Sequence, residues 1–374
     1  MKTINYKITK IVTLIIIINI NIFFPEIKNN KIDGINKIIN KSILNESKDV
    51  LNKQYINVSV IIPVYNCENT INSSILSIQQ QNLTNLEIIL VNDYSKDKSL
   101  NIIETFMKND SRIKLINNKK NYGTLYSRSI GALSAKGAYI FSLDNDDEFF
   151  GKDSFDYIYK QAIEGNHDII YFKKIYVRNK KKAKLRLNNI NFISNKSYIV
   201  HQPELSIFPI SKNGRFFENS FFIWDKCIKT DLYQKAVHLI ENEIKTHQIS
   251  YNEDIIIIFI IFSISKSMKI INQYGIIHYI YKTSTSRTRK RDYKIYCNIF
   301  FLDILFRFSK NNSHKNLCVE YFLRNWNFIN KTTSKYIYSY LIQILNKIIN
   351  DTYITKKNKA ILNKTIEDIE TKIK

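Results

Sequence analysis

Three apolar runs in the first half of the chain each end in polar residues, and this pattern constrains the fold more than any other feature. The runs are VSVIIPVYN from Val58, LEIILVND from Leu86 and AYIFSLDNDD from Ala138. Short runs rich in β-branched residues and bounded by turn residues indicate buried strands. Apolar residues at helical spacing separate these strands and predict helices over 67–81, 98–110 and 125–137.

Strands that alternate with helices predict βαβ units, and hence an α/β fold with a mostly parallel sheet flanked by helices. In such sheets the ligand lies beyond the carboxyl ends of the strands. Residues 63–68, Asp93 and residues 144–147 all follow strands, so we expect them to meet at one edge. Pro63 is expected to stop the first strand, and Gly137 is expected to close the helix over 125–137.

The acidic cluster after the strand that begins at Ala138 needs a counter-charge. Asp144, Asp146, Asp147 and Glu148 lie within five residues. Carboxylates two positions apart, just past a strand, can face one ligand when the chain turns. A divalent cation can bridge such carboxylates to the oxygens of a nucleoside diphosphate. A solvated acidic loop is the structural alternative.

The ordered motifs resemble those of the family 2 glycosyltransferases, which have the GT-A fold. The resemblance covers roughly residues 57–290 and is strongest up to Phe150. Its main stretches are VSVIIPVYNCENTINSSILSIQQQ, LEIILVNDYSKDKS and NNKKNYGTLYSRSIGALSAKGAYIFSLDNDDEFF. Weaker stretches are WDKCIKTDLY, YNEDIIIIF and IIHYIYKTSTSRTR.

This resemblance implies the roles of particular residues. The positions it assigns to the nucleotide-sugar are Pro63, Tyr65, Glu68, Asp93, Gly123, Arg128, Asp144 and Asp146. Among them, Asp93 would accept a hydrogen bond from the base, and Asp144 and Asp146 would hold the diphosphate through manganese or magnesium. Asp254 would be the catalytic base. Ser127 and Ser129 flank Arg128 where the family usually has Ala and Asn.

The residues alone leave structural roles open for several of these positions. Asp93 is also suited to capping the following helix, and Asp254 is suited to an N-cap, a position that Asp favours. A surface position on a helix is the structural alternative for Arg128. Trp224 reads as a core residue, with stacking on the acceptor as the alternative.

The implied function is an inverting transfer of a sugar from a nucleotide-diphosphate sugar, expected to be a UDP-sugar. The acceptor would be a hydroxyl on a glycan, a lipid or a protein. A hydroxyl is a poor nucleophile, so the reaction needs a general base. The alternative is a catalytically inactive GT-A-like protein that binds a nucleotide-sugar or a glycan. A processive polysaccharide synthase is disfavoured, because the chain lacks the QxxRW motif of those enzymes.

The chain is strongly basic, with 56 Lys and Arg against 33 Asp and Glu and a net charge of +23. Such a balance suits nucleic acid, an anionic membrane surface or phosphorylated ligands. No helix-turn-helix, RNP-type or zinc pattern appears in the sequence, so we expect no nucleic-acid partner. The four cysteines are scattered, which favours free buried thiols, with one disulfide as the alternative.

The N-terminus reads as a targeting segment. Lysines at positions 2, 7 and 10 precede the apolar run IVTLIIIININIFFP, residues 11–25. A spanning helix usually needs ~20 apolar residues, so an uncleaved signal anchor, a cleaved signal peptide and a buried helix all remain open. In a eukaryote an anchor would give a single-pass type II protein of the endoplasmic reticulum or Golgi, and otherwise a membrane-associated protein.

These patterns divide the chain into four parts. We expect a signal anchor or signal peptide over 1–30, a stem over 31–55, a GT-A domain over 56–290 and a helical C-terminal extension over 291–374. The run IIIIFIIF after Asp254 is too short to span a bilayer and predicts a core helix.

Overall fold

A computed structural model describes residues 56–178, 197–201, 222–280, 290–309, 312–330 and 334–373. The predicted targeting segment and stem lie outside these residues. Within the described ranges, no helix is long and apolar enough to cross a membrane.

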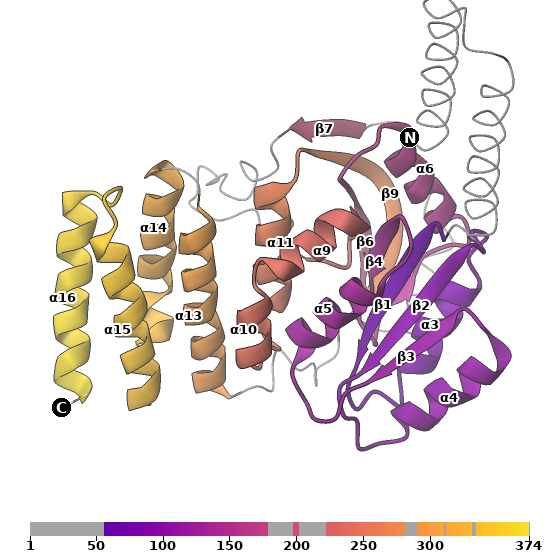
Figure 1. Cartoon of the computed structure of the whole chain (residues 1–374), viewed down its shortest axis with the longest axis horizontal. Helices are drawn as coiled ribbons and strands as arrows, with labels where there is room; N and C mark the ends of the chain where they lie inside the picture. Colours follow the sequence, from indigo (N-terminus) through magenta and orange to yellow (C-terminus); the bar gives the residue numbers. More distant parts are fainter. Residues whose placement is uncertain are drawn as a thin grey trace, which may run out of the picture. The chain divides into compact units, whose positions relative to one another are not determined.

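The strands form one mixed sheet in the order β3-β2-β1-β4-β8-β6-β9-β5, with β7 paired to β9 (Figure 1). Their bounds are β1 Val58–Val64, β2 Leu86–Asn92, β3 Ile113–Asn117, β4 Tyr139–Ser142, β5 Glu148–Phe149, β6 Ile169–Val177, β7 Ser197–His201, β8 Lys226–Lys229 and β9 Ser267–Tyr279. The strands β3, β2, β1 and β4 pair in parallel, as the sequence predicts. Beyond them β8 runs antiparallel to both β4 and β6. The α/β class is confirmed, with a parallel half followed by a mixed half.

Helices cover both faces of this sheet (Figure 1). Their bounds are α3 Ile71–Gln79, α4 Ser99–Asn109, α5 Thr124–Ser134, α6 Ser154–Glu164, α9 Thr230–His238, α10 Glu241–Thr246, α11 Glu253–Ile264, α13 Arg291–Phe308, α14 Asn312–Ile329, α15 Lys335–Asn350 and α16 Lys356–Ile373. Alternate residues of β1 enter different cores. Ile61 packs with residues of α5, α9 and α11, whereas Val60 and Ile62 pack with residues of α3 and α6. This alternation explains why β1 is apolar throughout.

Two sequence-based expectations about element ends are wrong. β1 continues through Pro63 to Val64. β4 pairs with β1 only as far as Ile61, so a proline without an N–H breaks no ladder bond at position 63. Helix α5 ends at Ser134 rather than at Gly137. Gly137 lies against β1, where a Cβ would come within 2.5 Å of the Val58 carbonyl carbon.

The apolar run after Asp254 forms the buried helix α11, which confirms the predicted core helix. α11 contacts α13, and α13 contacts α14 and α15, so the last helices continue the same core. All four cysteines are buried free thiols, as predicted. The domain boundary expected at residue 290 remains a prediction.

Candidate active site

The acidic loop between β4 and β5 is hydrogen-bonded to strand β1 and to helix α3. Asn145 donates from Nδ2 to the Pro63 carbonyl over 2.9 Å. Ser74 of α3 donates from Oγ to the carbonyls of Asn145, at 3.0 Å, and Asp147, at 2.8 Å. These bonds hold the loop at the carboxyl end of β1, the edge at which the sequence predicts the ligand.

A group of possible metal ligands lies in this loop. Asp144, Asp147 and His278 each offer a ligand atom, and these atoms all lie within 4.8 Å of one another. His278 Nδ1 lies 2.8 Å from Asp147 Oδ2, and the Tyr279 amide donates to the other Asp147 oxygen over 3.0 Å. Carboxylate and imidazole donors suit manganese, and carboxylates also suit magnesium. The structure thus groups Asp144 with Asp147 and His278, whereas the sequence pairs it with Asp146.

Electrostatics supports a site for a cation in this loop. Burial, together with the charges of its neighbours Asp147 and Asp144, raises the pKa of Asp146 to about 7. Burial also raises the pKa of Asp147 to about 6, although the hydrogen bond with His278 opposes it. Burial lowers the pKa of His278, but that bond and the nearby carboxylates outweigh burial and raise it overall. A bound cation would relieve the crowding of negative charge, so the residues present fit a divalent metal.

His278 is a candidate site residue that sequence reasoning missed. It lies on β9, and its ring stacks on Trp224 with the ring centroids 4.7 Å apart and the planes 8° apart. Trp224 itself is only 2% exposed, which makes it a core residue as predicted. A single histidine in the alternating stretch IIHYIY carries no signal of its own, because strand pairing alone brings it beside Asp147.

Arg128 lies between the acidic loop and the predicted base. Its Nη2 forms an ion pair with Asp144, and its Nε lies 3.6 Å from Asp254 Oδ1. The side chain is only 1% exposed, so the surface-helix alternative is wrong. Among the residues that the structure describes, Nε and Nη1 of Arg128 and Oδ1 of Asp254 have no hydrogen-bond partner. A buried polar atom without a hydrogen-bond partner lowers the stability of the fold, and a bound ligand would supply the missing partners.

Asp254 lies in the first turn of α11, and Asn252 occupies the N-cap. The capping alternative for Asp254 is therefore wrong. Burial raises the pKa of Asp254 well above its usual value, although the positive charge of Arg128 lowers it in part. A carboxyl group with a raised pKa is a better proton acceptor when ionised, a property that suits a general base.

Asp93 is buried behind the loop that leads into α5. Its Oδ1 accepts from Asn118 Nδ2 and from the Tyr122 amide, both at 2.9 Å, and its Oδ2 accepts from the Gly123 amide at 2.8 Å. Gly123 has φ +93°, and a Cβ there would lie 2.8 Å from the Ile249 carbonyl oxygen. The next helix, α4, has Lys98 as its N-cap, so Asp93 does not cap it.

Glu68 joins two loops at the same edge. Its carboxylate accepts from the Lys98 amide over 2.8 Å, and its own amide donates to Asp97 over 2.9 Å. Asn66 connects the same loops through a 2.8 Å bond from the Lys96 amide. Tyr65, the residue before Asn66, is 44% exposed. The carboxylate of Glu68 therefore binds a backbone amide, while the ring of Tyr65 is exposed.

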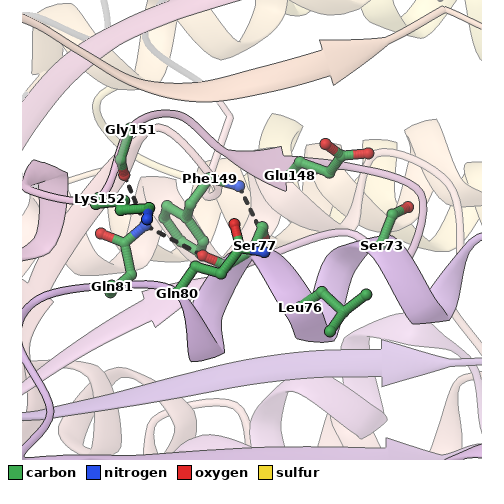
Figure 2. Close-up of a pocket in the computed structure, with 9 residues that line it drawn as sticks. All are labelled: Ser73, Leu76, Ser77, Gln80, Gln81, Glu148, Phe149, Gly151 and Lys152. Carbon is green, nitrogen blue, oxygen red and sulfur yellow. Dashed lines mark hydrogen bonds between the residues drawn. The ribbon is translucent and has the colours of Figure 1, made fainter.

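A separate pocket lies between α3 and β5 (Figure 2). Its lining residues are Ser73, Leu76, Ser77, Gln80, Gln81, Glu148, Phe149, Gly151 and Lys152. None of the site residues predicted from the sequence lines it. In Figure 2, Ser77 accepts from the Phe149 amide and Gln81 donates to the Gly151 carbonyl, at 3.1 and 2.8 Å. The first bond attaches β5 to α3, and the second joins the residues that follow these two elements, so both fix the chain directly after the acidic loop.

Residues 59–226 match the family model described as "Glycosyl transferase family 2". These residues are therefore similar to a glycosyltransferase family 2 domain. This domain contains β1 to β4, the acidic loop, Asp93 and Arg128, whereas Asp254 and His278 lie beyond its matched residues.

Similar proteins extend the comparison beyond the family 2 domain. An uncharacterized glycosyltransferase of Haemophilus influenzae is 44% identical over 90 residues, which are 24% of this chain and 36% of that protein. The match therefore spans little more than a third of that relative. The cholesterol galactosyltransferase of Borreliella burgdorferi is 28% identical over 319 residues, 83% of each chain. These relatives are bacterial and give no support to a eukaryotic secretory route.

A solved structure shares the GT-A fold of this chain. It is S. aureus TarS, residues 1–349, in complex with UDP, with a TM-score of 0.55 and 16% identity. The likeness covers 85% of this chain and 89% of that chain, so it extends into the C-terminal helices.

Proposed function

We propose that this glycosyltransferase is an inverting, divalent-cation-dependent enzyme that moves a sugar from a UDP-sugar to a hydroxyl acceptor. The observation that carries the proposal is the continuous cluster of Asp144, Arg128 and Asp254, with His278 and Asp147 beside Asp144. It places candidate metal ligands, a buried cation and a candidate base at one strand edge. The UDP bound in the TarS structure supports the choice of nucleotide.

In the proposed mechanism Asp254 removes the proton from the acceptor hydroxyl as its oxygen attacks the anomeric carbon. The C–O bond to the UDP leaving group breaks on the opposite face, which inverts the configuration. A divalent cation held by Asp144, with Asp146, Asp147 or His278, would stabilise the charge on the departing diphosphate. The unpartnered N–H groups of Arg128 are further donors toward that charge. Asp93 would hold the base.

The acceptor is a hydroxyl on a glycan, a lipid or a protein. The relative that aligns over 83% of this chain is named for a galactosyl transfer to cholesterol, so a lipid hydroxyl belongs in the first test. Membrane association through residues 11–25 is part of the proposal. Fractionation of cells that produce the full chain, compared with a chain lacking residues 1–30, would test it.

The deciding experiment measures UDP release from a panel of UDP-sugars with manganese. Acceptors would be cholesterol-containing vesicles, matched vesicles without sterol, and soluble glycans. We expect acceptor-dependent release with at least one donor, and its loss in Asp254→Asn. UDP binding without sugar transfer from any donor would instead favour the catalytically inactive binding protein.

A further inference from the structure

The segment 248–252, which leads into α11, is fixed on one side by the start of α5. The Leu125 amide donates to the Ile249 carbonyl, and the Thr124 amide donates to Ser250 Oγ, each over 3.0 Å. The backbone of Ile249 also lies where a Cβ on residue 123 would stand. Through this contact the segment meets the helix that carries Arg128 and the loop that Asp93 binds.

Helix α13 of the C-terminal extension fixes the same segment on the other side. The Tyr293 hydroxyl accepts from the Ser250 amide over 2.7 Å and donates to the Gln248 carbonyl over 2.9 Å. Asn298, on the same helix, accepts from Asn252 Nδ2 over 3.2 Å. A hydroxyl that bridges an N–H and a C=O two residues apart sets the path of that backbone, and no apolar ring can do so.

The chain direction changes sharply at the end of this segment. Asn252 has φ +58°, a left-handed conformation, and α11 begins at the next residue. Asp254 follows two positions after Asn252. The direction in which α11 presents its first turn therefore depends on how residues 248–252 are held. Such conformations persist only where surrounding contacts determine them.

We propose that Tyr293 is a positioning residue for sugar transfer. Its hydroxyl fixes segment 248–252 and thereby sets Asp254 relative to Arg128. The inference rests on the role proposed above for Asp254. It assigns to the C-terminal helices a function in catalysis that neither the family 2 match, which ends at residue 226, nor the sequence indicates.

The test compares Tyr293→Phe with Tyr338→Phe as a matched control. Tyr338 lies on α15, and its hydroxyl bonds to Asn330 at 3.3 Å, so its loss also removes one hydroxyl from the extension. We expect Tyr293→Phe to lower kcat by about 10- to 100-fold, the scale of a small misplacement of a catalytic group. The KM for the donor should change less than twofold, because the bonds of Asp93 stay intact. Tyr338→Phe should change neither constant.

Amide hydrogen exchange supplies a readout that does not depend on activity. We expect the amides of Ser250 and Thr124 to lose protection in Tyr293→Phe and to keep it in Tyr338→Phe. The inference would be overturned if Tyr293→Phe kept the kcat and the amide protection of the parent protein. Equal losses of kcat in Tyr293→Phe and Tyr338→Phe would also overturn it. So would a rise in the donor KM of Tyr293→Phe as large as its fall in kcat. If the parent protein transfers no sugar, the proposed function fails. The exchange measurement remains a separate test, because unchanged exchange in Tyr293→Phe would refute the positioning of segment 248–252 by Tyr293.

Discussion

Nε of Arg128 lies 3.6 Å from Oδ1 of Asp254, and the same guanidinium pairs with Asp144. One buried cation thus connects the acidic loop after β4 to the first turn of α11, two parts of the chain more than a hundred residues apart. Because Arg128 is almost fully buried, its charge is poorly screened by solvent and acts strongly on both carboxylates.

Replacing Arg128 with an uncharged residue should lower the free energy of unfolding. Arg128→Met removes the opposite charge with which buried Asp254 forms its ion pair, and breaking a buried pair typically costs about 3–5 kcal/mol of unfolding free energy. Urea unfolding of the isolated protein would measure the change. Lys160→Met, which removes an exposed pair with Asp156, is the control and should leave the midpoint unchanged. A fall in Arg128→Met no larger than that of the control would show that the buried pair contributes little.

Asp254→Asn should lower kcat by about 10²–10⁴-fold, the usual contribution of a general base. The amide keeps the shape of the side chain but cannot accept the proton. Donor affinity, measured as the Kd for UDP, should barely change. Turnover close to the parent value in a folded variant would exclude Asp254 as the base and make Glu253 the next residue to test.

The pH dependence of kcat should report the environment of Asp254. Burial raises its pKa, and the base works only when ionised. Activity at saturating donor should therefore fall as the pH drops through a value above the ordinary range of an aspartate. Arg128 lowers this pKa, so Arg128→Met should move the acid limb to higher pH. An acid limb that stays in place in Arg128→Met would contradict the coupling of the two side chains.

Chelation should abolish transfer, and manganese or magnesium should restore it. His278→Ala should weaken manganese binding, measured by calorimetry, by at least about tenfold, the lower end of the range for loss of a supporting group. His238→Ala is the control, because His238 is exposed on α9 and pairs only with Glu241 among the described residues. Full activity in chelator-treated enzyme would remove the metal from the mechanism.

Asp93→Ala should weaken UDP binding by about 1–3 kcal/mol, the usual cost of leaving a buried donor of the base without its partner. The same change frees the amides of Tyr122 and Gly123, so the loop before α5 should also lose protection from hydrogen exchange. Unchanged UDP affinity together with an altered loop would mean that Asp93 serves only the loop.

Local sequence patterns are enough to predict the parallel half of the sheet and the edge at which the polar residues gather. Val58, Leu86 and Tyr139 begin strands whose apolar pattern and polar ends are local properties, readable over a few residues. The acidic loop and Asp93 follow those strands directly, so the edge of the sheet that they share follows from strand direction alone.

The contacts among these polar residues depend instead on how distant segments pack together. His278 joins Asp147 because β9 returns beside β5, and Tyr293 reaches Ser250 because α13 packs against α11. The residues around Arg128 predict a helix but do not say whether its side chain is exposed. Arg128 is buried and joins Asp144 to Asp254 because α11 packs against α5. Pairings between distant segments depend on packing and on loop closure, for which a local pattern of residues carries no signal.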